Sequence, residues 1–152
     1  MLEVGDKVPA FTLEQTDGAR VRSADWKDQT VVLYFYPKDD TPGCTRQACS
    51  LRDGYAKLKH SGVAVYGISP DTVASHQKFT EKFSLPFPLL ADPDHAVAEK
   101  FGVWVEKNMY GKKSMGIART TFIIRGCKIV DIIKKVDTEN HAQQVLEHLP
   151  GK

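Results

Sequence analysis

Two cysteines near the start of a predicted helix are the residues of this chain best suited to chemistry. Cys44 follows Thr41, Pro42 and Gly43, and Cys49 comes five residues after it. Threonine is a common N-cap and proline is favoured at the first helical position, so we expect Cys44 to be the third helical residue. The unpaired N–H groups of a helix start favour an anion, and the Thr41 side chain could cap the Cys44 N–H. This position favours the nucleophilic thiolate of Cys44.

A reactive thiolate with a second thiol nearby indicates redox chemistry. Oxidation of Cys44 would give a sulfenic acid, which Cys49 could resolve to a disulfide. On an intact helix, five residues separate the two Cα atoms by roughly 8.6 Å, because each residue rises about 1.5 Å and lies about 2.3 Å from the axis. A disulfide requires Cα atoms within ~7 Å, so the helix start should unwind to form it. The alternative is an ordinary helix start that carries a small buried cysteine.

A buried strand and an amphipathic helix should position these cysteines. Residues 30–36 are β-branched or aromatic with one leucine, and the run ends at Pro37, which is typical of a strand buried on both faces. After a polar loop, one helix should extend to Gly62. Its apolar stripe is formed by Ala48, Leu51, Tyr55 and Leu58. Residues 63–68 predict a second buried strand, parallel to the first and joined to it by a right-handed crossover.

The remaining segments predict further strands and helices around this unit. Residues 8–13 read as an edge strand that forms a hairpin with residues 19–21 around Asp17-Gly18. Residues 23–26 suggest a single helical turn. A helix capped by Asp71 should extend to Phe83, with His76 on its apolar face as a structural histidine rather than a base.

The C-terminal half predicts a second hairpin between helices. A helix should start at Asp92-Pro93 and stop at Gly102, and residues 106–116 read as a mobile loop. Strands at 119–124 and 129–133 should follow, joined by the turn 125–128. A last helix, capped by Asp137 or Thr138, should bury Ala142, Val145, Leu146 and Leu149. These elements predict an α/β protein with a mixed central sheet flanked by helices.

The composition is that of an ordinary globular domain. With 152 residues, of which 41% are apolar and 26% charged, we expect one domain over 1–152. The net charge of +2 and the scattered basic residues argue against nucleic-acid binding. No apolar run approaches a membrane span, and residues 1–11 do not resemble a secretory signal. Three cysteines, an odd number, do not suit a disulfide framework, so we expect a cytoplasmic protein.

The segment around Cys44 also resembles a known family. Residues 35–45, Phe-Tyr-Pro-Lys-Asp-Asp-Thr-Pro-Gly-Cys-Thr, with Cys49 after them, are similar to the active-site segment of the peroxiredoxins, most closely the bacterioferritin-comigratory or PrxQ branch. Residues 116–122, Gly-Ile-Ala-Arg-Thr-Thr-Phe, resemble the second motif of that family. The resemblance covers nearly the whole chain and implies a thioredoxin-like fold with an N-terminal β-hairpin.

The resemblance also implies a function and a set of site residues. It implies a thiol peroxidase for hydrogen peroxide and alkyl hydroperoxides, with Cys44 as the peroxidatic and Cys49 as the resolving cysteine. Thr41 would bond to the peroxide, Arg119 would stabilise the thiolate, and Pro37 would shield it from water. Thioredoxin or a similar dithiol would reduce the disulfide, and the protein would be mostly monomeric. We expect no cofactor and no metal.

Several residues leave this assignment open. From the residues alone, Arg119 could not be preferred as the active-site cation over Arg46, Arg52 or Lys38. Gln47 occupies a position where this branch often has glutamate, and Cys127 has no role in the family pattern.

Two rival functions fit the sequence less well. A general thiol–disulfide oxidoreductase of the thioredoxin type would place its cysteines as C-x-x-C, whereas four residues separate Cys44 from Cys49. A zinc site that includes these cysteines would need nearby histidines, but the histidines are dispersed along the chain.

Overall fold

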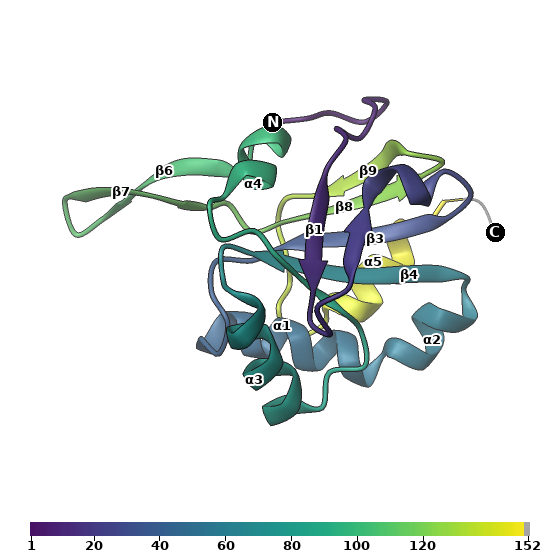
Figure 1. Ribbon diagram of the computed structural model, residues 1–152, viewed down its shortest axis with the longest axis horizontal. Helices are drawn as coiled ribbons and strands as arrows, with labels where there is room; N and C mark the ends of the chain where they lie inside the picture. Colours follow the sequence, from purple (N-terminus) through teal and green to yellow (C-terminus); the bar gives the residue numbers. More distant parts are fainter. Residues whose placement is uncertain (151–152) are drawn as a thin grey trace.

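The computed structural model describes residues 1–150 and is built on a seven-stranded mixed sheet (Figure 1). Its strands lie in the order β2-β1-β5-β4-β3-β8-β9. They span Thr12–Gln15 (β1), Arg20–Arg22 (β2), Thr30–Phe35 (β3), Val63–Ser69 (β4), Leu89–Ala91 (β5), Thr120–Arg125 (β8) and Lys128–Ile133 (β9). β3 pairs with β4 in parallel and with β8 in antiparallel orientation, so the predicted strand–helix–strand unit forms the centre of the sheet.

Helices cover both faces of this sheet (Figure 1). They span Ser23–Trp26 (the 3-10 helix η1), Pro42–Asp53 (α1), Tyr55–His60 (α2), Val73–Phe83 (α3), Ala96–Phe101 (α4) and His141–His148 (α5). Side chains of α1, α2, α3 and α5 pack in one core, and those of η1 and α4 pack in a second. The predicted α/β class, with a mixed central sheet between helices and an N-terminal hairpin, is confirmed.

Strand β3 contributes to both cores, as its continuous apolar sequence predicts. Val32 and Tyr34 belong to the core that also contains Cys44, whereas Leu33 and Phe35 belong to the opposite one. Because β3 is fixed on both faces and pairs on both edges, the loop that follows it starts from a rigid point. This loop leads directly to Cys44.

The helix that carries the two cysteines is shorter than predicted. α1 ends at Asp53, and Gly54, with φ −97° and ψ 6°, separates it from α2. A Cβ atom on Gly54 would lie only 2.4 Å from the Cβ of Ala142 in α5, so only glycine permits this approach. The apolar stripe still continues through the break, since Leu51 and Leu58 are buried in the same core.

The predicted cap of α3 is wrong by one residue. Thr72 is the N-cap, and its hydroxyl oxygen accepts a hydrogen bond from the Ser75 N–H at 3.2 Å. Asp71 instead accepts the Asp39 N–H at 2.9 Å. The Asp71 carboxylate therefore bonds to a residue 32 positions away rather than to its own helix, which a local sequence pattern cannot reveal.

Two other helices begin later than predicted. α4 begins at Ala96, although the Asp92 carboxylate still accepts the N–H groups of Val97 and Ala98. α5 begins at His141, with Asn140 rather than Asp137 or Thr138 as its N-cap. Asp92 bonds to amides five and six residues further on, whereas Asp137 bonds to the amides of Glu139 and Asn140, just before α5 begins.

The N-terminal hairpin forms with its strands shifted along the chain. The predicted strands 8–13 and 19–21 are replaced by β1 and β2, joined by a turn in which Gly18 has φ +85°. The edge strand is β2, since β1 pairs with both β2 and β5. β5 was not predicted, because its three residues lie too close to Pro88 to show a strand pattern.

The segment predicted as a mobile loop, residues 106–116, is part of a further β-hairpin. β6 (Trp104–Met109) pairs with β7 (Lys112–Ile117), and Tyr110 and Gly111 have positive φ at the turn. Figure 1 shows this hairpin extending away from the rest of the molecule. Most of its residues are exposed, so it lacks the apolar alternation by which a half-buried strand is recognised.

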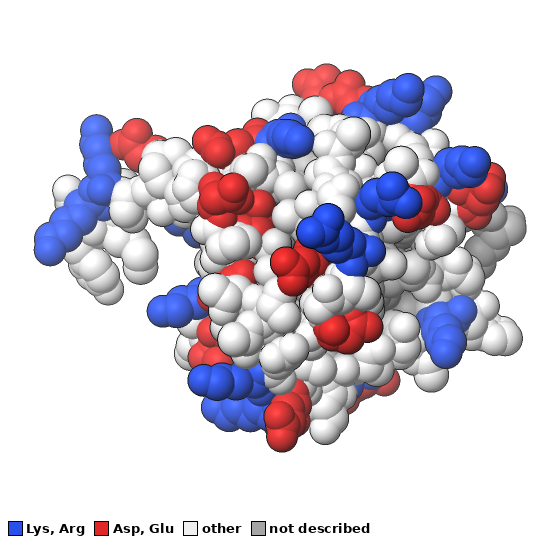
Figure 2. Space-filling model, in the orientation of Figure 1, with Lys and Arg blue, Asp and Glu red and all other residues white. Residues whose placement is uncertain are grey.

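The visible surface carries charges of both signs. Lysine and arginine are interspersed with acidic side chains on the face in Figure 2, and the projecting hairpin carries both. At the hairpin, Lys113 lies 3.7 Å from Glu106.

Within residues 1–150, no helix has the length and apolar character to cross a membrane.

Candidate active site

Cys44 lies at the start of α1, as its sequence context predicts. Pro42 is the first residue of the helix and Cys44 the third, and the Cys44 side chain is almost fully buried, with 2% of its surface exposed. Cys49 lies in the same helix at intermediate exposure, and neither thiol is in a disulfide. The fold therefore holds both sulfurs on an intact helix, the geometry in which they are too far apart to bond.

Thr41 is the N-cap by position but not by hydrogen bonding. No side chain caps α1, because the Thr41 hydroxyl donates instead to the Lys38 carbonyl at 2.9 Å. The predicted cap of the Cys44 N–H is therefore wrong. Because the Thr41 side chain does not accept from the amides at the start of α1, they remain free to donate hydrogen bonds to an oxygen atom of a bound ligand.

Arg119 contacts the sulfur directly. It lies just before β8, and its Nη2 is 3.3 Å from the Cys44 Sγ. Gly43 makes room for this approach, because a Cβ atom there would lie 3.1 Å from the Arg119 Nη2. Among the described residues, Arg119 is the one of the four candidate cations Arg119, Arg46, Arg52 and Lys38 that donates a hydrogen bond to Cys44.

Gln47 holds the other side of the guanidinium. Its Oε1 accepts a hydrogen bond from the Arg119 Nη1 at 2.6 Å, and its side chain is fully buried. Because an amide is neutral, it orients Arg119 without offsetting the positive charge that faces Cys44. The sequence marked Gln47 as a departure from the family pattern but could not identify its partner.

A second cation near the site was missed. Burial and the charge of Arg119 lower the pKa of Lys107 in β6, while the Cys44 sulfur acts in the opposite direction. Lys107 therefore lies within electrostatic reach of Cys44. Lys107 was not a candidate from sequence, because residues 106–116 were predicted to be a loop and not a strand beside the site.

The remaining candidates lie at different distances from the chemistry. Pro37 lies two residues after the end of β3 and is half-buried at the base of the loop. Cys127 lies in the β8–β9 turn with φ +61° and packs against the core on the opposite face of the sheet from Cys44. Its Sγ donates to the Ser23 carbonyl at 3.6 Å. The fold thus places Cys127 away from the two cysteines of α1.

One cluster has side chains close enough together to hold a metal ion. In the described part of the chain, the ligand atoms of Asp39, Asp71 and His76 lie within 4.8 Å of one another. These atoms are engaged in hydrogen bonds within the cluster, with His76 Nδ1 2.7 Å from an Asp39 oxygen. We infer that the cluster is a hydrogen-bonded network rather than a metal centre.

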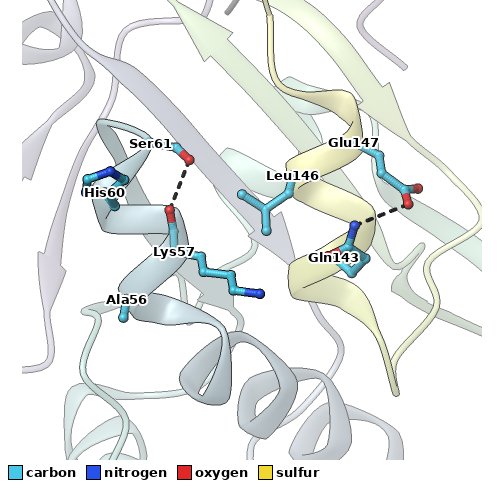
Figure 3. A pocket seen from close by; sticks show the side chains of 7 residues that line it. All are labelled: Ala56, Lys57, His60, Ser61, Gln143, Leu146 and Glu147. Carbon is cyan, nitrogen blue, oxygen red and sulfur yellow. Dashed lines mark hydrogen bonds between the residues drawn. The ribbon is translucent and has the colours of Figure 1, made fainter.

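A hollow between α2 and α5 is separate from the cysteines. Figure 3 shows the side chains that line it. Its volume is about 730 Å³. Its lining residues are Ala56, Lys57, His60, Ser61, Gln143, Leu146 and Glu147. None of them bears a thiol or contacts Arg119, so this hollow has no part in the cysteine chemistry.

Comparison with known proteins identifies the family of this chain. Residues 4–133 match the model of the AhpC/TSA family. The chain is 48% identical to a putative peroxiredoxin bcp of Coxiella burnetii, over 97% of this chain and 99% of the relative.

Two solved structures have the same fold. A PrxQ mutant of Xylella fastidiosa is 32% identical with a TM-score of 0.90, and the match covers 97% of this chain and 94% of that one. The bacterioferritin comigratory protein of Xanthomonas campestris, studied for alkyl peroxide reduction, is 36% identical with a TM-score of 0.84. That match covers 90% of this chain and 88% of the other.

Proposed function

The chain belongs to the AhpC/TSA family and is a peroxiredoxin, a thiol peroxidase, and we propose that Cys44 is its peroxidatic cysteine. The observation that carries this assignment is the 3.3 Å hydrogen bond from the Arg119 guanidinium to the Cys44 sulfur at the start of α1. The guanidinium and the helix N-terminus both favour a thiolate there. The substrates are hydrogen peroxide and alkyl hydroperoxides.

The first step is a displacement at oxygen. The Cys44 thiolate attacks one peroxide oxygen, an S–O bond forms, and the O–O bond breaks. The leaving oxygen departs as hydroxide or alkoxide and takes up a proton to become water or an alcohol. Arg119 and the amides of the helix start stabilise the negative charge that moves onto that oxygen. The Thr41 hydroxyl, which donates to the Lys38 carbonyl, can accept a hydrogen bond from the O–H of the bound peroxide.

The second step forms a disulfide within one chain. The Cys49 thiolate attacks the sulfur of the Cys44 sulfenic acid, the S–S bond forms, and hydroxide leaves as water after protonation. A dithiol reductant of the thioredoxin type then reduces the disulfide. Because both cysteines belong to one chain, the cycle needs no second subunit, and we propose that a monomer is sufficient. Such recycling suits the cytoplasm, where dithiols are kept reduced.

Replacing Cys49 with serine tests this assignment. The Cys49→Ser variant should still react once with peroxide at a rate within about twofold of wild type, because the attacking sulfur is unchanged. It should accumulate a sulfenic acid that a dimedone probe traps, and it should lose turnover with thioredoxin. Stopped-flow oxidation and coupled steady-state assays measure the two effects.

Cys127 provides the matched control for this experiment. Cys127→Ser should keep both the single-turnover rate and the steady-state rate, since Cys127 packs against the other face of the sheet. Full turnover of the double variant Cys49→Ser, Cys127→Ser would contradict the resolving role of Cys49. Insulin reduction assayed on the same samples distinguishes the rival thiol–disulfide oxidoreductase.

Disulfide formation should unwind the start of α1. Five helical residues place the Cα atoms of Cys44 and Cys49 roughly 8.6 Å apart, beyond the ~7 Å that a disulfide allows. In the oxidised protein, amides from Cys44 to Asp53 should exchange hydrogen at least about tenfold faster than in the reduced protein. Amides of β4 serve as the control and should not change. Equal protection of α1 in both states, with the disulfide confirmed by mass spectrometry, would contradict this prediction.

A further inference from the structure

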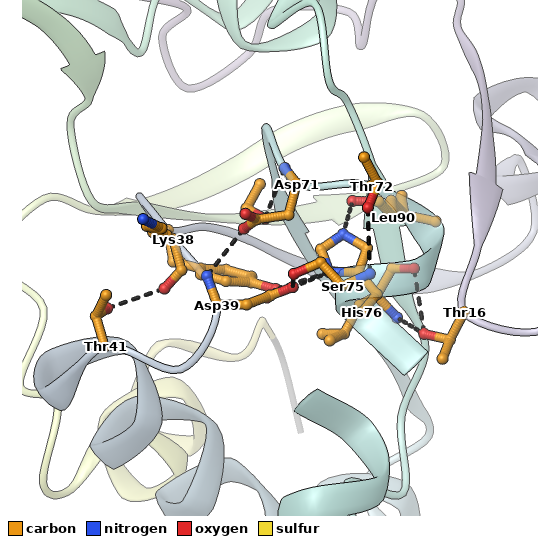
Figure 4. Close-up of polar contacts among 12 residues, drawn as sticks. Thr16, Lys38, Asp39, Thr41, Asp71, Thr72, Ser75, His76 and Leu90 are labelled. Atoms are coloured by element: carbon orange, nitrogen blue, oxygen red, sulfur yellow. Dashed lines mark hydrogen bonds and ion pairs between the residues drawn. The ribbon is translucent and has the colours of Figure 1, made fainter. Parts of the chain in front are cut away.

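A buried polar network fastens the loop before Cys44 to α3 (Figure 4). At its centre is the Asp39 carboxylate, whose side chain is 4% exposed. One of its oxygens accepts from the Tyr36 hydroxyl at 2.5 Å, and the other accepts from the Ser75 hydroxyl at 2.8 Å. The second oxygen also lies 2.7 Å from Nδ1 of His76, a fully buried side chain. The reaction described above uses none of these contacts.

The hydrogen bonds of His76 determine where its protons lie. Nε2 is 2.9 Å from the Leu90 carbonyl, which can only accept, so Nε2 carries a hydrogen. The short contact between Nδ1 and Asp39 then holds one proton between the two groups. The pair is thus neutral as a whole while each member remains fully bonded. Removing either member would leave the other buried without its partner, which is costly.

The backbone of Asp39 is fixed as well. Its N–H donates to Asp71 at 2.9 Å, and the same Asp71 oxygen accepts from the Ser69 hydroxyl at 2.6 Å. Ser69 ends β4 and Leu90 lies in β5, so the network connects the loop to two strands as well as to α3. Both the side chain and the main chain of Asp39 are therefore tied to the rigid part of the fold.

The next residue shows that the loop needs this restraint. Asp40 has φ +56°, a left-handed conformation that costs a non-glycine residue about 1 kcal/mol or more and persists only where its surroundings enforce it. Asp39 lies two residues after Pro37 and two before Thr41, so it is at the centre of the loop that carries both. A shift of Asp39 would move Thr41 and the helix start together.

We propose that Asp39 and His76 form a clasp that positions the loop 37–41 for the attack of Cys44 on peroxide. His76 is a positioning residue in this proposal, since it acts on Thr41 and Cys44 only through Asp39. The inference rests on the proposed peroxidatic role of Cys44. It adds that the rate of the first step depends on a side chain from α3 that contacts neither sulfur nor substrate.

The test compares two variants that loosen the same loop from the same helix. His76→Leu removes the clasp, and Lys82→Ala removes the exposed ion pair between Lys82 and Asp40, which joins the loop to α3 at 2.7 Å. A misplacement of about 1 Å can slow a reaction about 10²-fold, so His76→Leu should oxidise with peroxide at least about tenfold more slowly. Lys82→Ala should react at close to the wild-type rate, because exposed ion pairs contribute little.

A second readout separates positioning from other effects. Alkylation of Cys44 by iodoacetamide as a function of pH should be the same in His76→Leu and wild type, because Arg119 still faces the sulfur. His76→Asn, whose amide can return an N–H to Asp39, should recover part of the peroxide rate. All rates are measured below the melting transition of each variant, so that loss of folded protein does not enter.

Each outcome decides the proposal. A wild-type peroxide rate in folded His76→Leu overturns it, as does a rate loss matched by an equal shift of the alkylation profile. If His76→Leu does not fold, Asp39→Ala replaces it, because it removes the other member of the clasp, and a wild-type peroxide rate in folded Asp39→Ala overturns the proposal. Wild-type protein that does not oxidise at Cys44 would instead refute the proposed function, so the two failures are distinguishable.

Discussion

Replacing Cys44 with serine should abolish peroxide reduction. A serine hydroxyl remains protonated at neutral pH and is a poor nucleophile, so the Arg119 hydrogen bond and the helix start have no anion to stabilise. Removing an enzyme nucleophile can cost on the order of 10⁶-fold in rate, and we expect the Cys44→Ser rate to fall to that of peroxide in buffer. Peroxide consumption with thioredoxin, thioredoxin reductase and NADPH measures the loss.

The design of this experiment separates lost chemistry from lost structure. Serine is close in size to cysteine, and Cys44 is buried in the core beside α1, so the fold should be retained. A circular dichroism melt verifies this for each sample. Cys127→Ser serves as the thiol control and should retain full activity. Retention of most of the wild-type rate by folded Cys44→Ser would show that another group attacks peroxide.

The elements that hold the site could be predicted because their signals are local. The apolar run of β3 and the Thr41-Pro42 helix start both lie in the stretch from Thr30 to Cys44, and both elements formed as expected. The break at Gly54 was not predicted, because it depends on the close packing of Ala142, which belongs to a helix far away in the sequence. Local patterns therefore located the thiol correctly and failed where another part of the chain set the geometry.

The residues around the thiol are a different case, since long-range contacts place them. Arg119 is 75 positions from Cys44 in the chain, and only the family motif distinguished it from other cations. The bond of Gln47 to Arg119 and that of Asp39 to His76 could not be predicted for the same reason, because they span 72 and 37 positions. Asp71 shows the error that this causes. Its carboxylate was predicted to cap a helix, but it accepts a hydrogen bond from the Asp39 N–H instead.

Replacing Arg119 with alanine should slow the oxidation of Cys44 by about 10²-fold or more, the cost of losing one preorganised donor at a site of developing charge. Two effects combine in this loss. The thiolate loses the guanidinium that lies 3.3 Å from its sulfur, so a smaller fraction of Cys44 is ionised at neutral pH. The leaving oxygen also loses a cationic donor. Stopped-flow oxidation and alkylation as a function of pH measure the two effects separately.

Two further variants make this test specific for the charge of Arg119. Arg46→Ala removes an exposed arginine of α1, the helix that carries Cys44, and should have little effect on the oxidation rate. Gln47→Glu keeps a hydrogen-bond acceptor for Arg119 but adds a carboxylate that offsets its charge, so it should slow oxidation less than Arg119→Ala and in the same direction. If Arg119→Ala leaves the oxidation rate and the alkylation profile unchanged, Lys107 becomes the cation to test, because the Cys44 sulfur acts to raise the pKa of its ammonium group.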